Sequence, residues 1–436
     1  MKDIAEQIFL AGVDAVLPEK LIRSQVKLSG NFLHLAEWEF PLSRFRQIYL
    51  LAAGKAAAAM ACEMERLLGD RIRDGHIITK YGHGRALKRL TLTEAGHPVP
   101  DAEGVKGTQR MLDIARKAGE NDLVVCLLSG GASALMADLP EGISLDDLKR
   151  TNELLVTCGA DIAKINIIRK HLSGVKGGEL ARTLFPATTV SLILSDVVGN
   201  RLEVIASGPT AGDRTNFADA MDVINSYSLK EKLPASVLHH LQKGVAGSIP
   251  DTPKPDDPIF QNVYNYVIGS NSTALRAAAQ KAEELGCTTE IVTETLQGDY
   301  TAVADYILDT VENYQRPKRA KPLCLLFGGE PTVKVSGNGK GGRNQHLALY
   351  LATRISPKKR ITILCAGTDG TDGPTDAAGA VIDDKTVSNA LERGINPYQY
   401  LNGCDSYHFF QQAGGHIMTG NTGTNVMDMI VAIGED

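Results

Sequence analysis

The chain has 436 residues, more than one hydrophobic core usually organises, and this length predicts two domains. Hydrophobic residues make up 43% of the chain and charged residues 22%, which is typical of an ordinary soluble globular protein. The formal net charge of −5 excludes a general nucleic-acid-binding protein, because binding to the phosphate backbone requires clustered lysine and arginine.

The N-terminal segment, residues 1–18, places Ile4, Ile8, Ala11 and Ala15 on one face of an expected helix. It contains acidic residues and no long apolar core, which argues against a signal peptide. No run approaches the roughly 20 apolar residues of a membrane span, and the seven cysteines are dispersed, as expected for reduced thiols. We therefore expect a cytoplasmic protein with no membrane partner. The N-terminal helix should pack on the second domain or on another subunit, and the latter would make a homodimer.

Short β-rich apolar runs alternate with Ala- and Leu-rich helical patterns, which predicts an α/β fold. Strands buried on both faces are expected at 47–54, 76–82, 123–131, 188–196, 265–270, 288–294, 322–329, 331–337, 360–369 and 425–433. Residues 244–260 contain four prolines and three acids, a composition typical of a linker. We expect a first domain at 1–250, whose first 40 or so residues are helical, and a second domain at 251–436.

The turn after the first expected strand contains Lys55, just before an expected helix. Open parallel sheets bind ligands beyond the carboxyl ends of their strands, where helix N-termini offer N–H groups. An anion bound there would offset the repulsion between the lysine and the helix dipole. The alternative is a lysine that only extends into solvent from a tight turn. A Walker A loop is excluded, because its leading glycine and its final Ser or Thr are missing.

The turn after the third expected strand, "LLSGGASALM", combines Ser129, Gly130, Gly131 and Ser133. Glycines let backbone N–H groups approach a phosphate closely, and serine hydroxyls add donors. The alternatives are a purely structural glycine turn, or a serine nucleophile whose G-x-S-x-G spacing is absent. A local group of basic residues that includes Lys176 also suits a small anion.

Acidic residues follow two other expected strands. Asp196 ends the fourth strand, and three acids lie in the Gly-, Thr- and Pro-rich loop after the 360–369 run: Asp369, Asp372 and Asp376. Carboxylates in such turns suit Mg²⁺ or a general base. Helix capping and turn capping are the alternatives, and neither requires a catalytic role.

The segment "VSGNGKGGRNQH" contains Gly337, Gly339 and Gly342 in the G-x-G-x-x-G pattern of dinucleotide-binding proteins. Such a fingerprint normally opens the first βα turn of a nucleotide domain, whereas this one occurs late in the chain. Glycines around Lys340, followed by Arg343 at an expected helix N-terminus, are more typical of a flexible anion clamp. Two cations at two helix N-termini, with acids at neighbouring strand ends, predict a site for a phosphate and its metal.

Six segments carry a resemblance to a known family: "EAGHPVPD", "LLSGGASALM", "NIIRKHLSGVKGGELA", "SDVVGNRLEVIASGPT", "LFGGEPTVKVSGNGKGGRNQHLAL" and "AGTDGTDGPTDAAGAVID". From about Lys55 onward the chain resembles the type 2 glycerate kinases, also called glycerate 2-kinases, with their C-terminal MOFRL domain. The resemblance implies a Rossmann-like N-terminal domain, a MOFRL C-terminal domain and an active site in the cleft between them. It also implies ATP- and Mg²⁺-dependent phosphorylation of D-glycerate to 2-phosphoglycerate.

The active-site lysine of that family falls on Lys55 and its arginine on Arg343, and its acidic loop matches Asp369, Asp372 and Asp376. We expect Lys55 and Arg343 to neutralise charge on the transferring phosphoryl group and on the glycerate carboxylate. Asp369 is expected to orient or deprotonate the C2 hydroxyl. The division of metal binding and base catalysis among the acids stays open.

The remaining expected contacts are with the nucleotide and its metal. We expect the ATP phosphates to contact Ser129, Gly130, Gly131, Ser133, Lys176, Gly339, Gly341 and Gly342. We expect Mg²⁺ to be held by one or more of Asp196, Asp372 and Asp376. The substrates would then be two small molecules, D-glycerate and ATP, and no nucleic acid.

Two other functions fit parts of the sequence. An NAD(P)H-dependent hydroxypyruvate reductase would use the G-x-G-x-x-G pattern, but hydride transfer does not need the aspartate cluster. A non-catalytic protein that binds a nucleotide or a carboxylate would use the cations, but it has no evident use for acids beside them. Both alternatives are therefore weaker than a kinase.

Overall fold

The computed structural model describes residues 1–35, 37–315, 321–356 and 359–435, and the chain divides into two compact units. Unit 1 comprises Met1–Lys20, Asp196–Gly199 and Gly269–Asp436, and unit 2 comprises Leu21–Ser195 and Asn200–Ile268. The chain passes from unit 2 to unit 1 for the last time between Ile268 and Gly269, and not near residue 250. The proline-rich segment belongs to unit 2, where the carbonyl oxygen of Pro253 accepts the Asp213 N–H at 2.8 Å.

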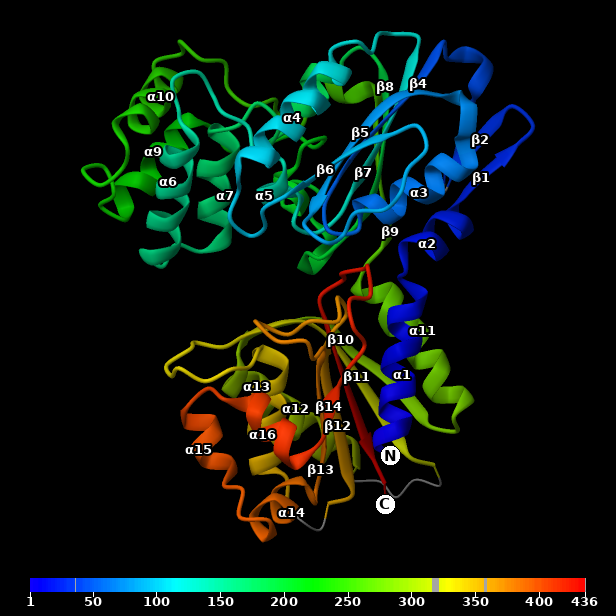
Figure 1. Ribbon diagram of the computed structural model, residues 1–436, viewed down its shortest axis with the longest axis vertical. Helices are drawn as coiled ribbons and strands as arrows, with labels where there is room; N and C mark the ends of the chain where they lie inside the picture. The colour runs from blue at the N-terminus through cyan, green and yellow to red at the C-terminus, as the bar shows by residue number, and fades with distance from the viewer. Residues whose placement is uncertain (36, 316–320, 357–358, 436) are drawn as a thin grey trace. The chain divides into compact units, whose positions relative to one another are not determined.

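Unit 2 is built on a six-stranded sheet of order β6-β5-β4-β7-β8-β9 (Figure 1). Its strands are β4 (Gln47–Ala53), β5 (Ile72–Lys80), β6 (Thr91–Ala95), β7 (Asp122–Leu128), β8 (Thr188–Leu194) and β9 (Val263–Gly269). Numbered from β4, this order is 3-2-1-4-5-6, the order of the Rossmann fold. The pairs from β6 to β8 are all parallel, and every residue of β7 is buried, as the continuous apolar runs predicted.

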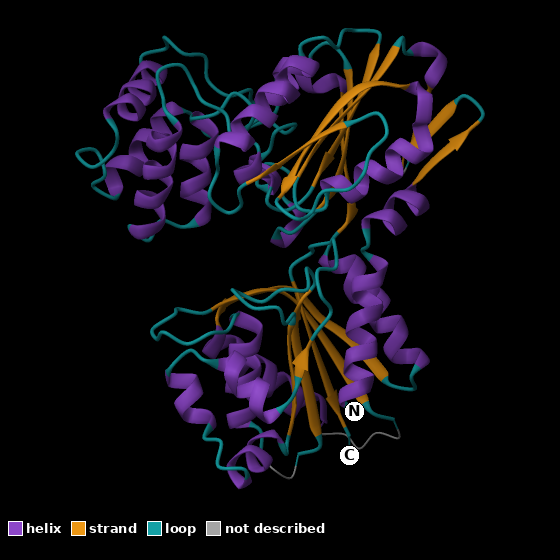
Figure 2. Ribbon diagram, viewed as in Figure 1, coloured by secondary structure: helices purple, strands orange, loops and turns teal. Residues whose placement is uncertain are grey.

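A separate group of helices, α6, α7, α9 and α10, stands beside this sheet (Figure 2). It has its own apolar core, which includes Leu155, Ile168, Ile224 and Leu241. The helices of unit 2 are α3 (Ala57–Leu68), α4 (Ala102–Ala115), α5 (Ala132–Leu135), α6 (Leu145–Thr157), α7 (Ile162–His171), α8 (Glu179–Leu184), α9 (Phe217–Ser226) and α10 (Ala235–Val245). The short 3₁₀ helices of the chain are Leu42–Arg44, Gly69–Arg71, Val198–Asn200, Ile205–Ser207 and Pro258–Asn262.

The expectation of an all-helical first 40 residues is wrong. After α2 (Pro18–Gln25), the chain forms an antiparallel three-stranded sheet of β1 (Val26–Ser29), β2 (Phe32–Leu35) and β3 (Trp38–Pro41). Leu33 and Leu35 are fully buried, so the segment follows the alternating period of a strand. The Trp38 ring packs edge-on against Tyr264 and Tyr266, with ring centroids 5.4 and 5.9 Å away.

Unit 1 contains a mixed six-stranded sheet of order β10-β11-β15-β12-β13-β14. Its strands are β10 (Thr288–Asp299), β11 (Leu323–Thr332), β12 (Ile361–Gly367), β13 (Gly379–Asp383), β14 (His416–Ile417) and β15 (Asp428–Gly434). Only β10 and β11 pair in parallel, and the other four pairs are antiparallel. The separate strand expected at 331–337 is wrong, because β11 ends at Thr332 and the Val335 that follows is 69% exposed.

Helices cover both faces of the unit 1 sheet: α1 and α11 lie side by side on one face, and α12 and α13 lie on the other (Figure 1). The helices are α1 (Lys2–Ala15), α11 (Asn271–Glu284), α12 (Tyr300–Gln315), α13 (Arg343–Arg354), α14 (Thr386–Glu392), α15 (Pro397–Asn402) and α16 (Ser406–Ala413). The N-terminal helix thus packs on the second sheet, and a homodimer stays a prediction. Within the described residues, no helix combines the length and apolarity needed to cross a membrane.

Phe9→Ala should test the packing of α1, because Phe9 is fully buried and its neighbour Leu10 is 39% exposed. Truncating a buried phenylalanine leaves a cavity, so the free energy of unfolding of unit 1 should fall by about 3–5 kcal/mol. Leu10→Ala is the matched control and should cost less than about 1 kcal/mol. Urea denaturation followed by circular dichroism measures both, and equal costs would contradict the packing of α1.

Candidate functional site

The strand order of unit 2 reverses between β4 and β7, the first and fourth strands of the Rossmann order. Such a reversal opens a crevice beyond the carboxyl ends of the two strands, where ligands of this fold bind. Ala53 pairs with Leu128 at this edge, so the turns that follow the two strands meet. The Ser129 N–H donates to the Ala53 carbonyl oxygen at 3.1 Å, and the Lys55 N–H donates to the Gly130 carbonyl oxygen at 2.9 Å.

Gly54 makes this meeting of turns sterically feasible. Its φ angle is +130°, a left-handed conformation that side chains disfavour, and a Cβ there would lie 2.1 Å from the Ser129 hydroxyl oxygen. That hydroxyl accepts the Ala56 N–H at 3.0 Å and so helps to start α3. Lys55, the residue between Gly54 and Ala56, is therefore held at the crevice by backbone geometry.

Two histidines, neither among the expected site residues, accompany Lys55. A Cβ built on Gly131 would lie 3.0 Å from the His97 ring and 3.3 Å from the Lys55 Cγ, which places all three residues together. The His83 Nδ1 is 3.1 Å from the Lys55 carbonyl oxygen, and burial lowers the pKa of His83. His97 follows β6, so a search of every strand end would have found it.

The other expected nucleotide contacts in unit 2 have partners within the protein. The Ser133 hydroxyl is 2.7 Å from that of Ser207. The Lys176 ammonium is buried, donates to the Met136 carbonyl oxygen at 2.7 Å and lies 3.7 Å from the Asp138 carboxylate. Burial lowers the pKa of Lys176, although Asp138 opposes this effect. Lys176 therefore joins α5 to the loop after α7 and also lines a cavity beside Ser133.

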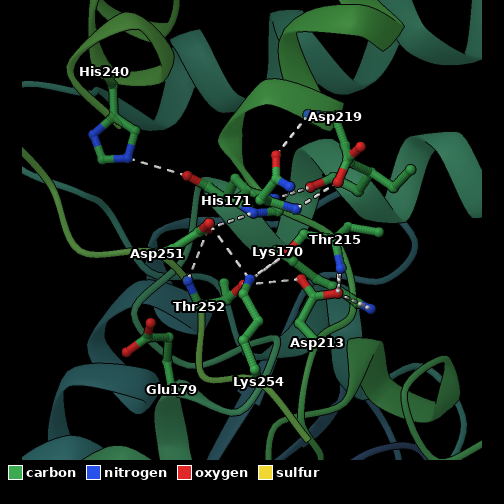
Figure 3. Close-up of polar contacts among 12 residues, drawn as sticks. Lys170, His171, Glu179, Asp213, Thr215, Asp219, His240, Asp251, Thr252 and Lys254 are labelled. Carbon is green, nitrogen blue, oxygen red and sulfur yellow. Dashed lines mark hydrogen bonds and ion pairs between the residues drawn. The ribbon is translucent and has the colours of Figure 1, made fainter. Parts of the chain in front are cut away.

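A polar network fixes the end of α7 (Figure 3). Lys170 and Asp213 form a buried ion pair at 3.2 Å, and the His171 Nε2 is 3.1 Å from the Asp251 carboxylate. The nearby Glu179 is paired with Arg182 at 2.7 Å. Burial raises the pKa of Glu179 to about 7, against the opposing effect of Arg182. The network holds the segment that leads to Lys176 but places no side chain at the Lys55 turn.

In unit 1, Arg343 begins α13 and forms an extensive set of ion pairs. Its Nε and Nη2 donate to both Asp428 carboxylate oxygens at 2.6 and 2.9 Å, and its Nη1 donates to Glu330 at 2.6 Å. Burial disfavours the charge, but the two carboxylates outweigh it and raise the pKa of Arg343. These bonds use three of the five N–H groups of the guanidinium. The sequence analysis does not predict Asp428, which lies within the apolar run 425–433, or Glu330, which lies between two expected strands.

The glycine-rich segment before α13 is packed rather than flexible. A Cβ on Gly339 would lie 2.4 Å from Asp405, and one on Gly342 would lie 2.2 Å from Asp372. The Gly339 N–H donates to the Gly403 carbonyl oxygen at 3.0 Å, and the Lys340 N–H donates to Asp405 at 2.8 Å. The N–H of Gly339 therefore bonds within the protein, which argues against its expected contact with ATP.

This segment also differs from a dinucleotide fingerprint. Residues 333–342 separate β11 from α13, and a segment of this length is not the tight βα turn of the fingerprint. The turn that corresponds to the fingerprint position is the one after β4, and it reads Ala-Gly-Lys-Ala at residues 53–56. The geometry therefore disfavours a nicotinamide cofactor at either place.

Asp372 is a helix cap rather than an evident metal ligand. It is 2% exposed, and its two carboxylate oxygens accept the backbone N–H groups of Asn344 and Gln345 at 3.0 and 2.8 Å. The side-chain amides of the same two residues add bonds of 3.4 and 3.1 Å. Burial raises the pKa of Asp372 to about 6 despite these donors. Both oxygens are thus committed to the start of α13.

The other expected acids of unit 1 each contact a different partner. One oxygen of Asp369 accepts the Thr371 N–H at 3.1 Å, and one oxygen of Asp376 accepts the Tyr407 hydroxyl at 2.7 Å. An Asp196 oxygen is 3.5 Å from the Asn425 amide nitrogen. Among the residues with described positions, no three His, Cys, Asp or Glu side chains gather as metal ligands.

Comparisons with known proteins place the chain in a family. Residues 4–242 match the family described as a domain of unknown function, DUF4147, and residues 323–428 match the MOFRL family. A protein of Pyrococcus horikoshii named glycerate 2-kinase is 42% identical over 99% of this chain and 97% of its own length. The chain belongs to the glycerate 2-kinase family with a C-terminal MOFRL domain.

Two further relatives extend this result. A D-glycerate 2-kinase of Thermotoga maritima is 38% identical over 99% of this chain and 98% of its own length. The solved structure of a glycerate kinase from that organism matches with a TM-score of 0.85 over 100% of this chain and 99% of the other. A protein of Agrobacterium vitis, provisionally named hydroxypyruvate reductase, is 36% identical over 87% of this chain and 85% of its own length.

Asp372→Ala should destabilise unit 1, because it removes the acceptors of two N–H groups at the start of α13. We expect the free energy of unfolding to fall by about 1–3 kcal/mol. Asp376→Ala, at an exposed acid of the same loop, is the control and should cost less than about 1 kcal/mol. Urea denaturation in the presence of EDTA measures both variants without any contribution from a metal. No loss of stability in Asp372→Ala would contradict its role as a cap.

Glu179→Gln should change how stability depends on pH. The folded-state pKa of Glu179, about 7, lies above the ordinary value of 4.5, so the protonated carboxyl stabilises the fold below pH 4.5. That contribution is lost as the pH rises through 7. From pH 5 to pH 8, wild type should therefore lose up to about 3 kcal/mol relative to Glu179→Gln, at roughly 1.4 kcal/mol per pKa unit.

The Glu179 experiment requires thermal unfolding of both proteins at pH 5, 6.5 and 8. Glu153→Gln provides the control, because the Glu153 side chain is 62% exposed and should leave the pH profile unchanged. A constant difference between wild type and Glu179→Gln at all three pH values would show that Glu179 is not perturbed by burial.

Proposed function

We propose that this protein transfers the γ-phosphoryl group of ATP to D-glycerate, at the C2 hydroxyl, to give 2-phosphoglycerate. We place this reaction in the cytoplasm, in keeping with seven cysteines that are all free thiols. The observation that carries the proposal is the meeting of the Lys55 turn and the 129–131 turn at the strand-order reversal of unit 2. The names of the relatives from P. horikoshii and T. maritima support the choice of substrate and of the C2 position.

Unit 2 supplies a cation and N–H groups for the phosphates. Lys55 precedes α3, a helix of 12 residues, and lies next to Gly131 and His97. A lysine at a helix N-terminus makes a positive pocket that suits the charge spread over the oxygens of a transferring phosphoryl group. In this proposal Gly130 and Gly131 contact the phosphates through their backbone, while Ser129 mainly maintains the turn.

Unit 1 supplies a second cation and a base. Arg343 keeps two N–H groups beyond those bonded to Asp428 and Glu330, and these are proposed to bind the glycerate carboxylate. The two acids fix the guanidinium in one orientation, which favours a substrate held in one pose. Asp369 remains our candidate for orienting or deprotonating the C2 hydroxyl. Gly341 and Gly342 are retained as phosphate contacts.

The acids of unit 1 fit a magnesium ion only in part. Mg²⁺ in kinases is usually held by one or two carboxylates together with substrate phosphates, so a three-carboxylate site is unnecessary. Asp196 and Asp376 offer the hard carboxylate oxygens that Mg²⁺ prefers and would hold the ion, which leaves Asp369 as the base. Asp372 does not fit, since both of its oxygens accept N–H groups of α13. When bound, Mg²⁺ would neutralise charge on the β- and γ-phosphates.

Lys55→Met should reduce kcat by about 10³-fold, because a cation that stabilises a phosphoryl-transfer transition state contributes on that order. Lys27→Met, at an exposed lysine of β1, is the matched control and should retain wild-type activity. Phosphorus-31 NMR with ATP, Mg²⁺ and D-glycerate measures both turnover and the position of the new phosphate. Activity of Lys55→Met close to that of wild type would overturn the role of Lys55.

The same spectrum separates the alternatives for wild type. A 2-phosphoglycerate resonance supports the proposal, and a 3-phosphoglycerate resonance would retain the kinase but reject the C2 position. ATP binding without turnover would indicate a non-catalytic binding protein. Oxidation of NADH by hydroxypyruvate, without phosphoryl transfer, would favour the reductase named for the relative from A. vitis.

A further inference from the structure

Unit 2 contains a cavity of about 650 Å³ next to the glycine turn. The loop after β6 provides Pro98–Pro100, α5 provides Ser133 and Ala134, and the remaining wall is formed largely by α6 and α7. The aliphatic part of the helical wall comprises Leu148, Leu155, Val156, Ile168 and Leu172, and the polar part includes the acids Asp146 and Glu153 and the cations Lys149, Arg150 and Arg169. The cavity therefore combines an apolar interior with direct continuity, through α5, to the turn at Gly130 and Gly131.

Arg169 is a half-buried cation of this wall. Its Nε donates to the Asn152 side-chain oxygen at 2.8 Å, and no carboxylate lies within ion-pair distance of it among the described residues. By contrast, the neighbouring cations Lys170 and Lys176 lie 3.2 and 3.7 Å from Asp213 and Asp138. The side chain is half-buried, and burial lowers the pKa of Arg169. A cation in this condition favours a ligand with negative charge or π-electrons.

The dimensions and chemistry of the cavity exclude glycerate as its main occupant. Pockets of about 300–1,000 Å³ hold ligands of the size of a drug or a nucleoside, whereas glycerate is a three-carbon acid with few apolar atoms. A flat heterocyclic base fits between aliphatic side chains, and a guanidinium binds well to an aromatic face or to a phosphate. The occupant must also reach the glycine turn, since Ser133 lines the cavity and lies two residues beyond Gly131.

We propose that this cavity binds the nucleoside end of ATP, with the base against the aliphatic wall of α6 and α7 and Arg169 as its cationic contact. The phosphate chain then passes Ser133 to the turn at Gly130 and Gly131, where Lys55 lies. This inference rests on the proposed function, because it assigns the donor of that reaction to a position. It also gives α6 and α7 a role in substrate binding that the Rossmann sheet alone does not provide.

Two variants test the cavity by calorimetric titration with ADP and with inorganic tripolyphosphate. Val156→Trp narrows the cavity from a side chain that is 61% exposed, so the fold should tolerate it. Arg169→Met removes the cation but keeps an unbranched side chain. Each variant should weaken ADP binding by about tenfold or more, equivalent to 1.4 kcal/mol. Val156→Trp should leave tripolyphosphate binding unchanged, because that probe has no nucleoside.

Matched controls separate these effects from general changes. Val245→Trp, at a 53% exposed position of α10, and Arg73→Met, at an exposed position of β5, should both bind ADP as wild type does. In steady-state assays the two cavity variants should raise KM for ATP and leave KM for D-glycerate unchanged. Thermal unfolding of each variant verifies that the fold is retained.

The outcomes are distinct. Unchanged ADP binding in both folded cavity variants overturns the proposal, and so does a rise in KM for D-glycerate alone, which would assign the cavity to the acceptor. Equal weakening of ADP and tripolyphosphate by Val156→Trp also overturns it, because the cavity would then bind only phosphate. A wild-type protein that binds ADP through this cavity but phosphorylates nothing would reject the proposed function and leave the nucleoside site intact.

Discussion

The parallel pairing of β4 with β7 is the constraint on which the candidate site of unit 2 depends. Both strands end at the same edge, and the order of the sheet reverses between them, so their turns meet there. Two backbone hydrogen bonds join the turns, and Gly54 allows them to approach because it has no side chain. The position of Lys55 follows from this contact. A local backbone requirement therefore decides where the chemistry of the unit can be located.

The sequence predicts strand positions best where a strand is buried on both faces. Strands buried on both faces form continuous apolar runs, so the sequence predicts β4, β7 and β8 to within three residues. The same signal does not reveal which strands pair or in which direction. The run at 425–433 gave no sign that β15 would lie between β11 and β12 and pair antiparallel with both. The three-stranded sheet at 26–41 was missed because its alternating pattern is short.

The candidate site was predictable to the extent that its residues follow strands directly. Lys55 and the 129–131 turn were found in this way. Asp372 was not recognised as a helix cap, because helix capping is normally sought in the residue just before the helix. That residue is Gly342, which has no side chain, and Asp372 supplies the missing acceptor from 30 positions further along the chain. A capping acceptor that comes from so far along the chain leaves no local pattern in the sequence.

The order of the units along the chain has a consequence for synthesis. Unit 1 begins with the first helix of the protein and ends with its last strand, and the Thr424 hydroxyl donates to the Val16 carbonyl oxygen across 408 positions. On the ribosome, α1 therefore emerges long before the sheet that buries Ile8 and Phe9 exists. Almost all of unit 2 is translated in the interval and can fold while the apolar face of α1 remains uncovered. No continuous piece of the gene encodes unit 1 alone.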